Sequence, residues 1–335
     1  MSPKSVVMRR LAGSDAPARP VMLAIAGDSA AGKTTLTRGL VEALPDGAVG
    51  SICVDDYHRY DRAERRTVPY TPLDPRCNYV GIMEQHLQLL AMGEPILKPV
   101  YGHREGTLDR PVLVEPSPTV VVEGLLPLHS RLSRACFDLT VYLDPPEPVR
   151  RAWKIARDTR DRGYTTEQVL AELDRREADS QAYIHPQRRW ADIVVRFEPI
   201  AQRGEDASNP SATILLRPTA PHPDLSGILG AKERGTVHLK LMRDVDGKPV
   251  DALHVHAYAS RDATRDIEEA IWDQIGFGTE PPASLGVLRD GVRTEPLAVV
   301  QLILLYHLVM ADRARAGVES APAPRPVPGP TVVGG

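Results

Sequence analysis

The chain has 335 residues, of which 42% are hydrophobic and 25% charged, and its formal net charge is -3. A dedicated nucleic-acid-binding protein normally carries a basic excess, so this balance argues against that class and restricts any basic site to a local cluster. The three cysteines, Cys53, Cys77 and Cys136, contain no C-x-x-C pair. We therefore expect no structural zinc, no disulfide and a reducing, cytoplasmic location.

The first predicted element is a strand over residues 21–26, and the run Gly27-Asp28-Ser29-Ala30-Ala31-Gly32-Lys33-Thr34 follows it directly. The run fits the phosphate-binding pattern G-x-x-x-x-G-K-[ST], in which glycines let successive N–H groups turn inward around phosphates. Lys33 can then reach the β- and γ-phosphates, and the Thr34 hydroxyl can ligate Mg²⁺. A helix with Leu36 and Leu40 on one face comes next. We expect residues 27–35, Thr35 included, to bind ATP.

A second strand over 50–54 ends at Asp55 and Asp56. Acidic residues at the carboxyl edge of a parallel sheet lie where such sheets bind ligands, and an aspartate there can accept the proton of an attacking hydroxyl. A helix cap or a surface turn is the alternative for this pair. Residues 59–78 read as a long loop of the lid type, and residues 80–92 return to helical spacing.

A hairpin is predicted over 97–103 and 106–113, followed by an apolar strand over 119–124 that contains Glu123. A carboxylate at the end of such a strand suits a magnesium site shared with Thr34, although a simple acidic strand end is the alternative. The next buried strand covers 139–143. Its successor at 193–197 is expected to close the sheet.

Between these two strands lie predicted helices over 148–162 and 166–182. The segment 150–189 has ten Lys and Arg against seven Asp and Glu, so it is basic within an acidic chain. Lys154, Arg157, Asp158 and Arg162 fall on one broad helix face and could hold phosphates, or could form a solvated, salt-bridged surface. His58 and His103 are single histidines in loops.

Strands that alternate with helices predict a P-loop NTPase-type, doubly wound and mostly parallel α/β sheet. We expect a flexible segment at 1–18, the P-loop domain at 19–200, a smaller C-terminal α/β extension at 213–318 and a disordered Pro-rich tail at 319–335. Within the extension, a hairpin is predicted over 236–243 and 252–258, with helices over 262–275 and 295–316. The apolar stretch 296–310 predicts a buried or dimer-interface helix, because it is short and interrupted for a membrane span. No signal peptide is expected.

The chain resembles the phosphoribulokinases, within the phosphoribulokinase and uridine kinase group of P-loop kinases. Six blocks beyond the P-loop carry the resemblance: Asp55-Asp-Tyr-His-Arg-Tyr-Asp-Arg62, Thr71-Pro-Leu-Asp-Pro-Arg-Cys-Asn78, Lys98-Pro-Val-Tyr-Gly-His103, Val122-Glu-Gly-Leu125, Trp153-Lys-Ile-Ala-Arg-Asp158 and Arg160-Asp-Arg-Gly163. The extra domain is similar to that of the longer, photosynthetic type, which is usually a homodimer. Redox-regulated members have a P-loop cysteine where this chain has Ala31, which predicts that an intramolecular thiol switch is absent.

The resemblance implies transfer of the ATP γ-phosphoryl group to O1 of D-ribulose 5-phosphate, which gives the acceptor for CO₂ in the Calvin cycle. It implies Asp55 as general base, with Lys33, Lys154 and Asp158 as further catalytic residues and Arg157 as an ATP contact. It implies a metal site at Thr34 and Glu123. The implied sugar-phosphate contacts are His58, Arg62, Tyr101, His103, Arg157, Arg162 and Arg176.

Two alternatives remain open. A uridine kinase shares the P-loop, the strand-end aspartate and an acid at the place of Glu123. A nucleoside acceptor would, however, require stacking contacts, and aromatic residues make up only 5% of the chain. A non-catalytic nucleotide-binding regulator is the second alternative, although such a protein would be expected to lack one of Lys33, Thr34, Asp55 and Glu123. Nucleic acid and membrane partners are not expected.

Overall fold

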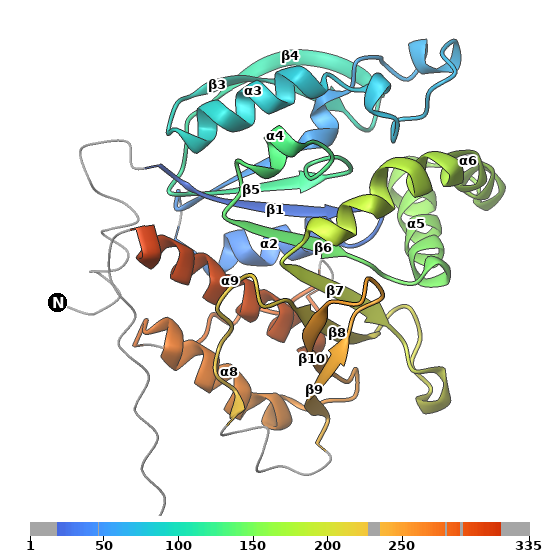
Figure 1. Cartoon of the computed structure of the whole chain (residues 1–335). Helices are drawn as coiled ribbons and strands as arrows, with labels where there is room; N and C mark the ends of the chain where they lie inside the picture. The colour runs from blue at the N-terminus through green and yellow to red at the C-terminus, as the bar shows by residue number, and fades with distance from the viewer. Residues whose placement is uncertain (1–18, 46, 227–234, 279, 289–290, 316–335) are drawn as a thin grey trace, which may run out of the picture.

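One eight-stranded sheet organises the molecule, with strand order β2-β5-β1-β6-β7-β8-β10-β9 (Figure 1). The computed structural model describes residues 19–45, 47–226, 235–278, 280–288 and 291–315. The predictions for 1–18 and for the tail at 319–335 lie outside these residues. The sheet is mostly parallel, as the sequence predicts.

Five strands form the parallel part of the sheet, and most of their side chains are apolar. Strands of this kind are buried on both faces of a sheet, so helices must cover both sides. Each of the seven residues of β1 is buried. The strands are β2 (Val49–Cys53), β5 (Thr119–Gly124), β1 (Val21–Gly27), β6 (Leu139–Leu143) and β7 (Ile193–Glu198).

Helices pack on both faces of this sheet. Helices α2 (Lys33–Ala43), α8 (Arg261–Ile275) and α9 (Glu295–Arg315) share one core with Leu23 and Ile25 of β1. Helix α3 (Val80–Ala91) shares another core with Met22 on the opposite face, where the short α4 (Arg131–Arg134) also lies. Helices α5 (Glu147–Arg162) and α6 (Thr166–Asp179) lie together beyond the strand ends (Figure 1). The sheet is therefore doubly wound.

Helix α9 is long and apolar enough to cross a membrane by length and composition alone. In this fold its residues from Pro296 to Val309 are all buried, and they pack against α2, α8 and the sheet. A helix that is apolar on all sides is typical of the interior of a large domain. The expectation of a buried helix is confirmed.

The expectation that the strand at 193–197 closes the sheet is wrong. Strand β8 (Ser211–Leu216) pairs antiparallel with β7, and β10 (Pro249–Val255) and β9 (Val237–Arg243) continue the sheet beyond it. Strand β8 begins inside the polar stretch 200–212, so the composition of this stretch did not predict a strand. The sheet thus runs without a break across the predicted boundary between the P-loop domain and the extension.

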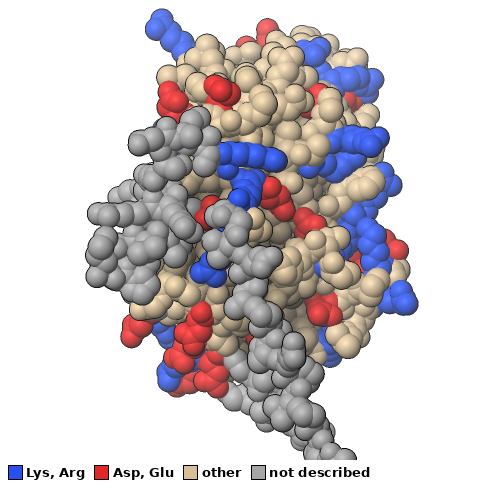
Figure 2. All heavy atoms as spheres, turned by 60° about the vertical axis from the view of Figure 1, so that its left-hand side comes forward, with Lys and Arg blue, Asp and Glu red and all other residues tan. Residues whose placement is uncertain are grey.

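A separate two-stranded hairpin, β3 (Ile96–Gly102) with β4 (Thr107–Val114), lies beside α3, as predicted. Figure 2 shows a face of the molecule on which Lys and Arg gather mainly along the right-hand side, while Asp and Glu are scattered. Basic side chains are therefore unevenly distributed over this face, although the net charge of the chain is -3.

Candidate active site

The P-loop joins β1 to α2 in a conformation that its glycines permit. Gly27 has a φ of 153°, and a Cβ there would approach the carbonyl oxygen of Leu143 to 2.9 Å. Gly32, with a φ of 97°, is the left-handed residue that precedes α2. The Lys33 amine donates to the carbonyl oxygens of Gly27 and Asp28 at 2.9 and 2.8 Å. These bonds hold the lysine over the loop.

Thr34 and Glu123 come from different elements and meet at the carboxyl ends of the strands. The Thr34 hydroxyl donates to Oε1 of Glu123 at 3.0 Å. Burial raises the pKa of Glu123, and the nearby Lys33 ammonium opposes this rise. Among the described residues, no group of three or more His, Cys, Asp and Glu side chains is arranged to hold a metal ion. A cation here would therefore take most of its remaining ligands from phosphates and water, as Mg²⁺ commonly does.

Asp55 and Asp56 lie in a short 3₁₀ turn, Val54–Tyr57, directly after β2. Oδ1 of Asp55 accepts the backbone N–H of Leu125 at 3.0 Å. Gly124 makes this approach possible, because a Cβ there would lie 2.9 Å from the same oxygen. Since β2 pairs with β5, Asp55 is brought to the strand end that carries Glu123.

Asp56 has a different role from its neighbour. Its carboxylate pairs with the Lys98 ammonium and accepts the backbone N–H of Tyr101 at 3.1 Å. Asp56 therefore fixes the β3–β4 hairpin to the end of β2, whereas no cation lies within ion-pair distance of Asp55 among the described side chains. Of the two, Asp55 is the carboxylate available to a substrate.

Four of the predicted sugar-phosphate residues gather around the β3–β4 hairpin. His58 is buried, bonds Oδ1 of Asn78 through Nδ1 at 2.6 Å and packs edge-on against Tyr101. Burial lowers the pKa of His58 to about 4, so its ring is neutral at pH 7. Arg62 donates to the carbonyl oxygens of His103 and Arg104 at 2.7 and 3.1 Å. The structure therefore brings His58, Arg62, Tyr101 and His103 together.

Arg65 joins this group, although no sequence pattern singled it out. One of its guanidinium nitrogens donates to the Tyr101 hydroxyl, and Nη1 is buried without a hydrogen-bond partner among the described residues. Its charge also helps to lower the pKa of His58, although burial is the larger cause. Only its placement in the fold identifies Arg65, because the adjacent Arg66 is equally basic in sequence.

The predicted basic cluster of α5 surrounds one buried carboxylate. Asp158 is 3% exposed and pairs with Lys154 at 2.6 Å, Arg157 at 2.8 Å and Arg162 at 3.4 Å. Burial disfavours the charge of Asp158, but its bonds to Arg157 and Lys154 outweigh this effect and lower its pKa. Burial, together with the nearby Arg176, lowers the pKa of Lys154 to about 8. The alternative of a solvated, salt-bridged face is therefore right about the salt bridges and about the partly exposed Arg157 and Arg162, but not about Lys154 and Asp158, which are buried.

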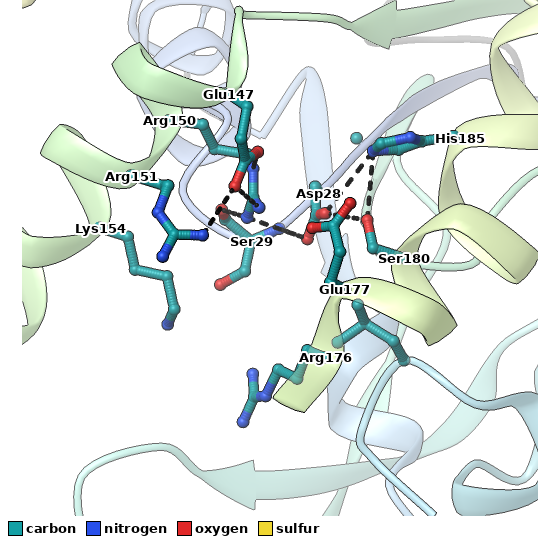
Figure 3. A network of polar contacts seen from close by, with 12 residues as sticks. Asp28, Ser29, Glu147, Arg150, Arg151, Lys154, Arg176, Glu177, Ser180 and His185 are labelled. Atoms are coloured by element: carbon teal, nitrogen blue, oxygen red, sulfur yellow. Dashed lines mark hydrogen bonds and ion pairs between the residues drawn. The ribbon is translucent and has the colours of Figure 1, made fainter. Parts of the chain in front are cut away.

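Side chains of α5 connect the P-loop to this cluster. Arg157 donates to the Ser29 hydroxyl at 3.3 Å. Arg150 reaches the Asp28 carboxylate at 3.4 Å (Figure 3). The Asp28 carboxylate also accepts the hydroxyl of Ser180, whose oxygen lies 3.2 Å from Nε2 of His185. Sequence reasoning missed Arg150, Ser180 and His185, because residues this far from the P-loop in sequence give no local signal. Arg176 bonds Glu172 at 2.6 Å and lines the same pocket as Lys154.

The model of the phosphoribulokinase / uridine kinase family matches residues 22–202, more than half of the chain. The chain belongs to this family. A cyanobacterial member, the phosphoribulokinase of Synechocystis, is 43% identical over 181 residues, which are 54% of each chain. The chloroplastic phosphoribulokinase of Mesembryanthemum crystallinum is 35% identical over 215 residues, 59% of this chain and 53% of that protein. The chain thus spans about half the length of these curated relatives.

Two further family members bear on function and fold. The uridine kinase of Oceanobacillus iheyensis is 30% identical over 184 residues, 53% of this chain and 86% of that enzyme. The solved phosphoribulokinase of Rhodobacter sphaeroides superposes with a TM-score of 0.54 at 19% identity, over 76% of this chain and 97% of that one. This likeness shows the fold, which agrees with the P-loop kinase architecture predicted from the sequence.

Proposed function

We propose that this chain is a phosphoribulokinase, which transfers the γ-phosphoryl group of ATP to O1 of D-ribulose 5-phosphate and yields ribulose 1,5-bisphosphate for carbon fixation. One observation carries the proposal: Asp55, which has no cationic partner among the described side chains, lies at the same strand ends as Lys33, Thr34 and Glu123. A phosphate-binding loop and an available carboxylate are then combined in one site. The 43% identity to a cyanobacterial phosphoribulokinase supports the choice of acceptor.

The chemistry follows from these positions. The O1 hydroxyl of the sugar attacks the γ-phosphorus, the bond from that phosphorus to the β–γ bridging oxygen breaks, and Asp55 takes the hydroxyl proton. Lys33 and the N–H groups of the P-loop hold the phosphates of ATP. Phosphoryl transfer depends mainly on such positioning and on neutralisation of charge.

The acceptor requires groups for its own 5-phosphate. Around Asp158, Lys154, Arg157 and Arg162 supply three cations to one carboxylate, so positive charge remains for a phosphate. Arg62 presents a further guanidinium. His58, neutral at pH 7, would contribute a hydrogen bond to the sugar instead of a charge.

Magnesium is part of this proposal. The Thr34 hydroxyl and the Glu123 carboxylate, 3.0 Å apart, are oxygen donors of the kind that Mg²⁺ prefers. When bound there, the ion would neutralise charge on the β- and γ-phosphates. Cytoplasmic location is likewise proposed, on the three free cysteines, of which Cys77 and Cys136 are buried.

We also propose that the protein is a homodimer. Strand β9 is at the edge of the sheet, and its Leu241 and Met242 are 81% and 45% exposed. An exposed apolar edge strand offers unpaired backbone groups to a second strand. Pairing of two β9 strands would cover these side chains.

The competing assignment is a uridine kinase, which the match over 86% of such an enzyme favours. The deciding experiment measures ADP release from Mg-ATP with ribulose 5-phosphate, with uridine and with no acceptor. We expect turnover with ribulose 5-phosphate alone. Turnover with uridine would identify the competing activity, and none above background would favour a non-catalytic nucleotide-binding protein.

A further inference from the structure

Gln301 is a polar residue at the centre of the apolar helix α9, and it is fully buried. A buried amide carries a large desolvation cost unless its donor and its acceptor are both bonded. The residues before and after it, Val300 and Leu302, are also fully buried. A polar side chain in such a place calls for specific partners.

Those partners lie on the P-loop helix and on the loop before α9. Oε1 of Gln301 accepts the backbone N–H of Gly286 at 2.7 Å, and Nε2 donates to the carbonyl oxygen of Thr35 at 3.4 Å. Thr35 directly follows Lys33 and Thr34. The Gln301 amide also lies against Gly39, where a Cβ would be only 1.9 Å from Nε2.

A second tether connects the same two regions. Arg38 of α2 donates to the carbonyl oxygen of Val287 at 3.3 Å, one residue beyond the glycine that Gln301 binds. The loop at 286–287 and helix α9 therefore contact α2 at its first turn and at its middle, and the P-loop leads into that first turn. The C-terminal extension thereby holds the helix that follows the phosphate-binding loop through polar contacts with defined geometry as well as through apolar packing.

We propose that Gln301 is a positioning residue: through Thr35 and Gly39 it fixes the register of α2 against α9, and so fixes Lys33 and Thr34 for the phosphates of ATP. Gly39 is the matching feature on α2, because only a residue without a side chain lets the amide lie against the helix backbone. This inference rests on the proposed use of Mg-ATP, but not on the identity of the acceptor.

The test compares Gln301→Met with His307→Leu. Both changes remove a buried polar group from α9, but His307 bonds His222 and the carbonyl oxygen of Ile303, and neither residue belongs to α2. The affinity for a fluorescent ATP analogue is measured in the presence of Mg²⁺ and without acceptor. The midpoint of urea unfolding is measured for the same variants. We expect both variants to lose stability, and Gln301→Met alone to bind the nucleotide about fivefold more weakly, as the loss of one hydrogen bond implies.

A second pair of variants approaches the contact from the other helix. Gly39→Ala would displace the Gln301 amide, whereas Gly81→Ala adds the same methyl group to α3, where nothing lies within 4 Å. We expect weaker nucleotide binding for Gly39→Ala alone. This pair decides the question if Gln301→Met does not fold.

In turnover assays, the KM for ATP should rise in Gln301→Met while the KM for the acceptor stays unchanged. Wild-type nucleotide affinity in Gln301→Met or Gly39→Ala, or an equal loss in His307→Leu, would overturn the proposal. If the wild-type protein binds Mg-ATP but does not phosphorylate ribulose 5-phosphate, the proposed function fails and the positioning role stands. If it binds no Mg-ATP, both fail.

Discussion

Two buried carboxylates, Asp158 in α5 and Asp244 beyond β9, are held by cations in clusters that differ in their balance of charge. Asp158 meets Lys154, Arg157 and Arg162, and among the described residues no other carboxylate lies within ion-pair distance of these three cations. The other cluster is balanced in charge among the described residues. Its cations, Arg188, Arg196, Arg217 and Lys248, pair with the carboxylates of Asp144, Glu198, Asp244 and Asp246.

The difference separates a binding cluster from a structural one. Cations that outnumber the buried carboxylate they pair with lower the stability of the fold. They are retained where an anionic ligand can neutralise the remaining positive charge. Around Asp244 the charges are satisfied within the protein, and the cluster fixes the turn between β9 and β10 to the segment that precedes β7. The first cluster is accordingly expected to affect substrate binding, and the second only folding.

The largest effect is expected from a change that leaves both clusters intact. Asp55→Asn removes the proposed proton acceptor, and kcat should fall about 10²–10⁴-fold, the usual contribution of a general base. Mg-ATP affinity should remain at the wild-type value, because Lys33 and the P-loop are unchanged. Steady-state kinetics with nucleotide binding measure both, and unaltered turnover would rule out Asp55 as the base.

Asp158→Asn removes the central carboxylate of the binding cluster, which consists of Asp158, Lys154, Arg157 and Arg162. Lys154, Arg157 and Arg162 would lose their buried partner, and we expect a loss of about 3 kcal/mol in unfolding free energy. The KM for the sugar phosphate should also change, because these cations would move. Asp174→Asn is the control: Asp174 pairs with Arg151 at 2.7 Å but its side chain is 69% exposed. Its effect on urea unfolding should stay below about 1 kcal/mol.

Asp244→Asn tests the structural cluster. Burial would raise the pKa of Asp244, but hydrogen bonds from Arg188 and Arg217 lower it well below the ordinary range. Its carboxylate therefore stabilises the fold above the unfolded-state pKa of about 3.9, and this contribution is lost as pH falls below that value. We expect the variant to lose about 2 kcal/mol at pH 7 and to show a weaker acid dependence of unfolding. A changed KM for either substrate would contradict the contrast with Asp158.

A smaller effect should appear in the pH profile. Because burial lowers the pKa of Lys154 to about 8, the lysine loses its charge in the free enzyme as pH rises above that value. One unit above this pKa, kcat/KM for the sugar phosphate should be about tenfold lower if the charged form alone binds. In Lys154→Arg the decline should disappear from this range, since arginine stays protonated. A profile that is identical in the two proteins would exclude Lys154 as its source.

Much of the site follows from local sequence patterns. The P-loop is contiguous, so residues 27–34 identify it without knowledge of the fold. Strands 119–124 and 139–143 are equally clear, because short runs rich in apolar and β-branched residues are typical of buried strands. Helical spacing likewise places Lys154, Arg157, Asp158 and Arg162 on one face of α5, where the structure has them.

The rest of the site depends on contacts between residues that are distant in sequence. Asp55 and Asp56 are adjacent residues of the same type, so the sequence does not distinguish their roles. The β3–β4 hairpin distinguishes them, because its Lys98 pairs with Asp56. Strand β8 begins in a polar stretch and was not predicted from sequence, and its pairing with β7 and β10 defines it as a strand. The contact of Gln301 with Thr35 joins residues 266 positions apart.

The sequence alone thus determined the phosphate-binding loop, the alternation of strands and helices, and the residues with the chemistry of a kinase. The tertiary structure decided which carboxylate stays available, which cations exceed their partners, and how the C-terminal extension holds the P-loop helix. The physical reason is that propensity and periodicity act over a few residues, whereas burial and charge pairing depend on which segments the sheet brings together.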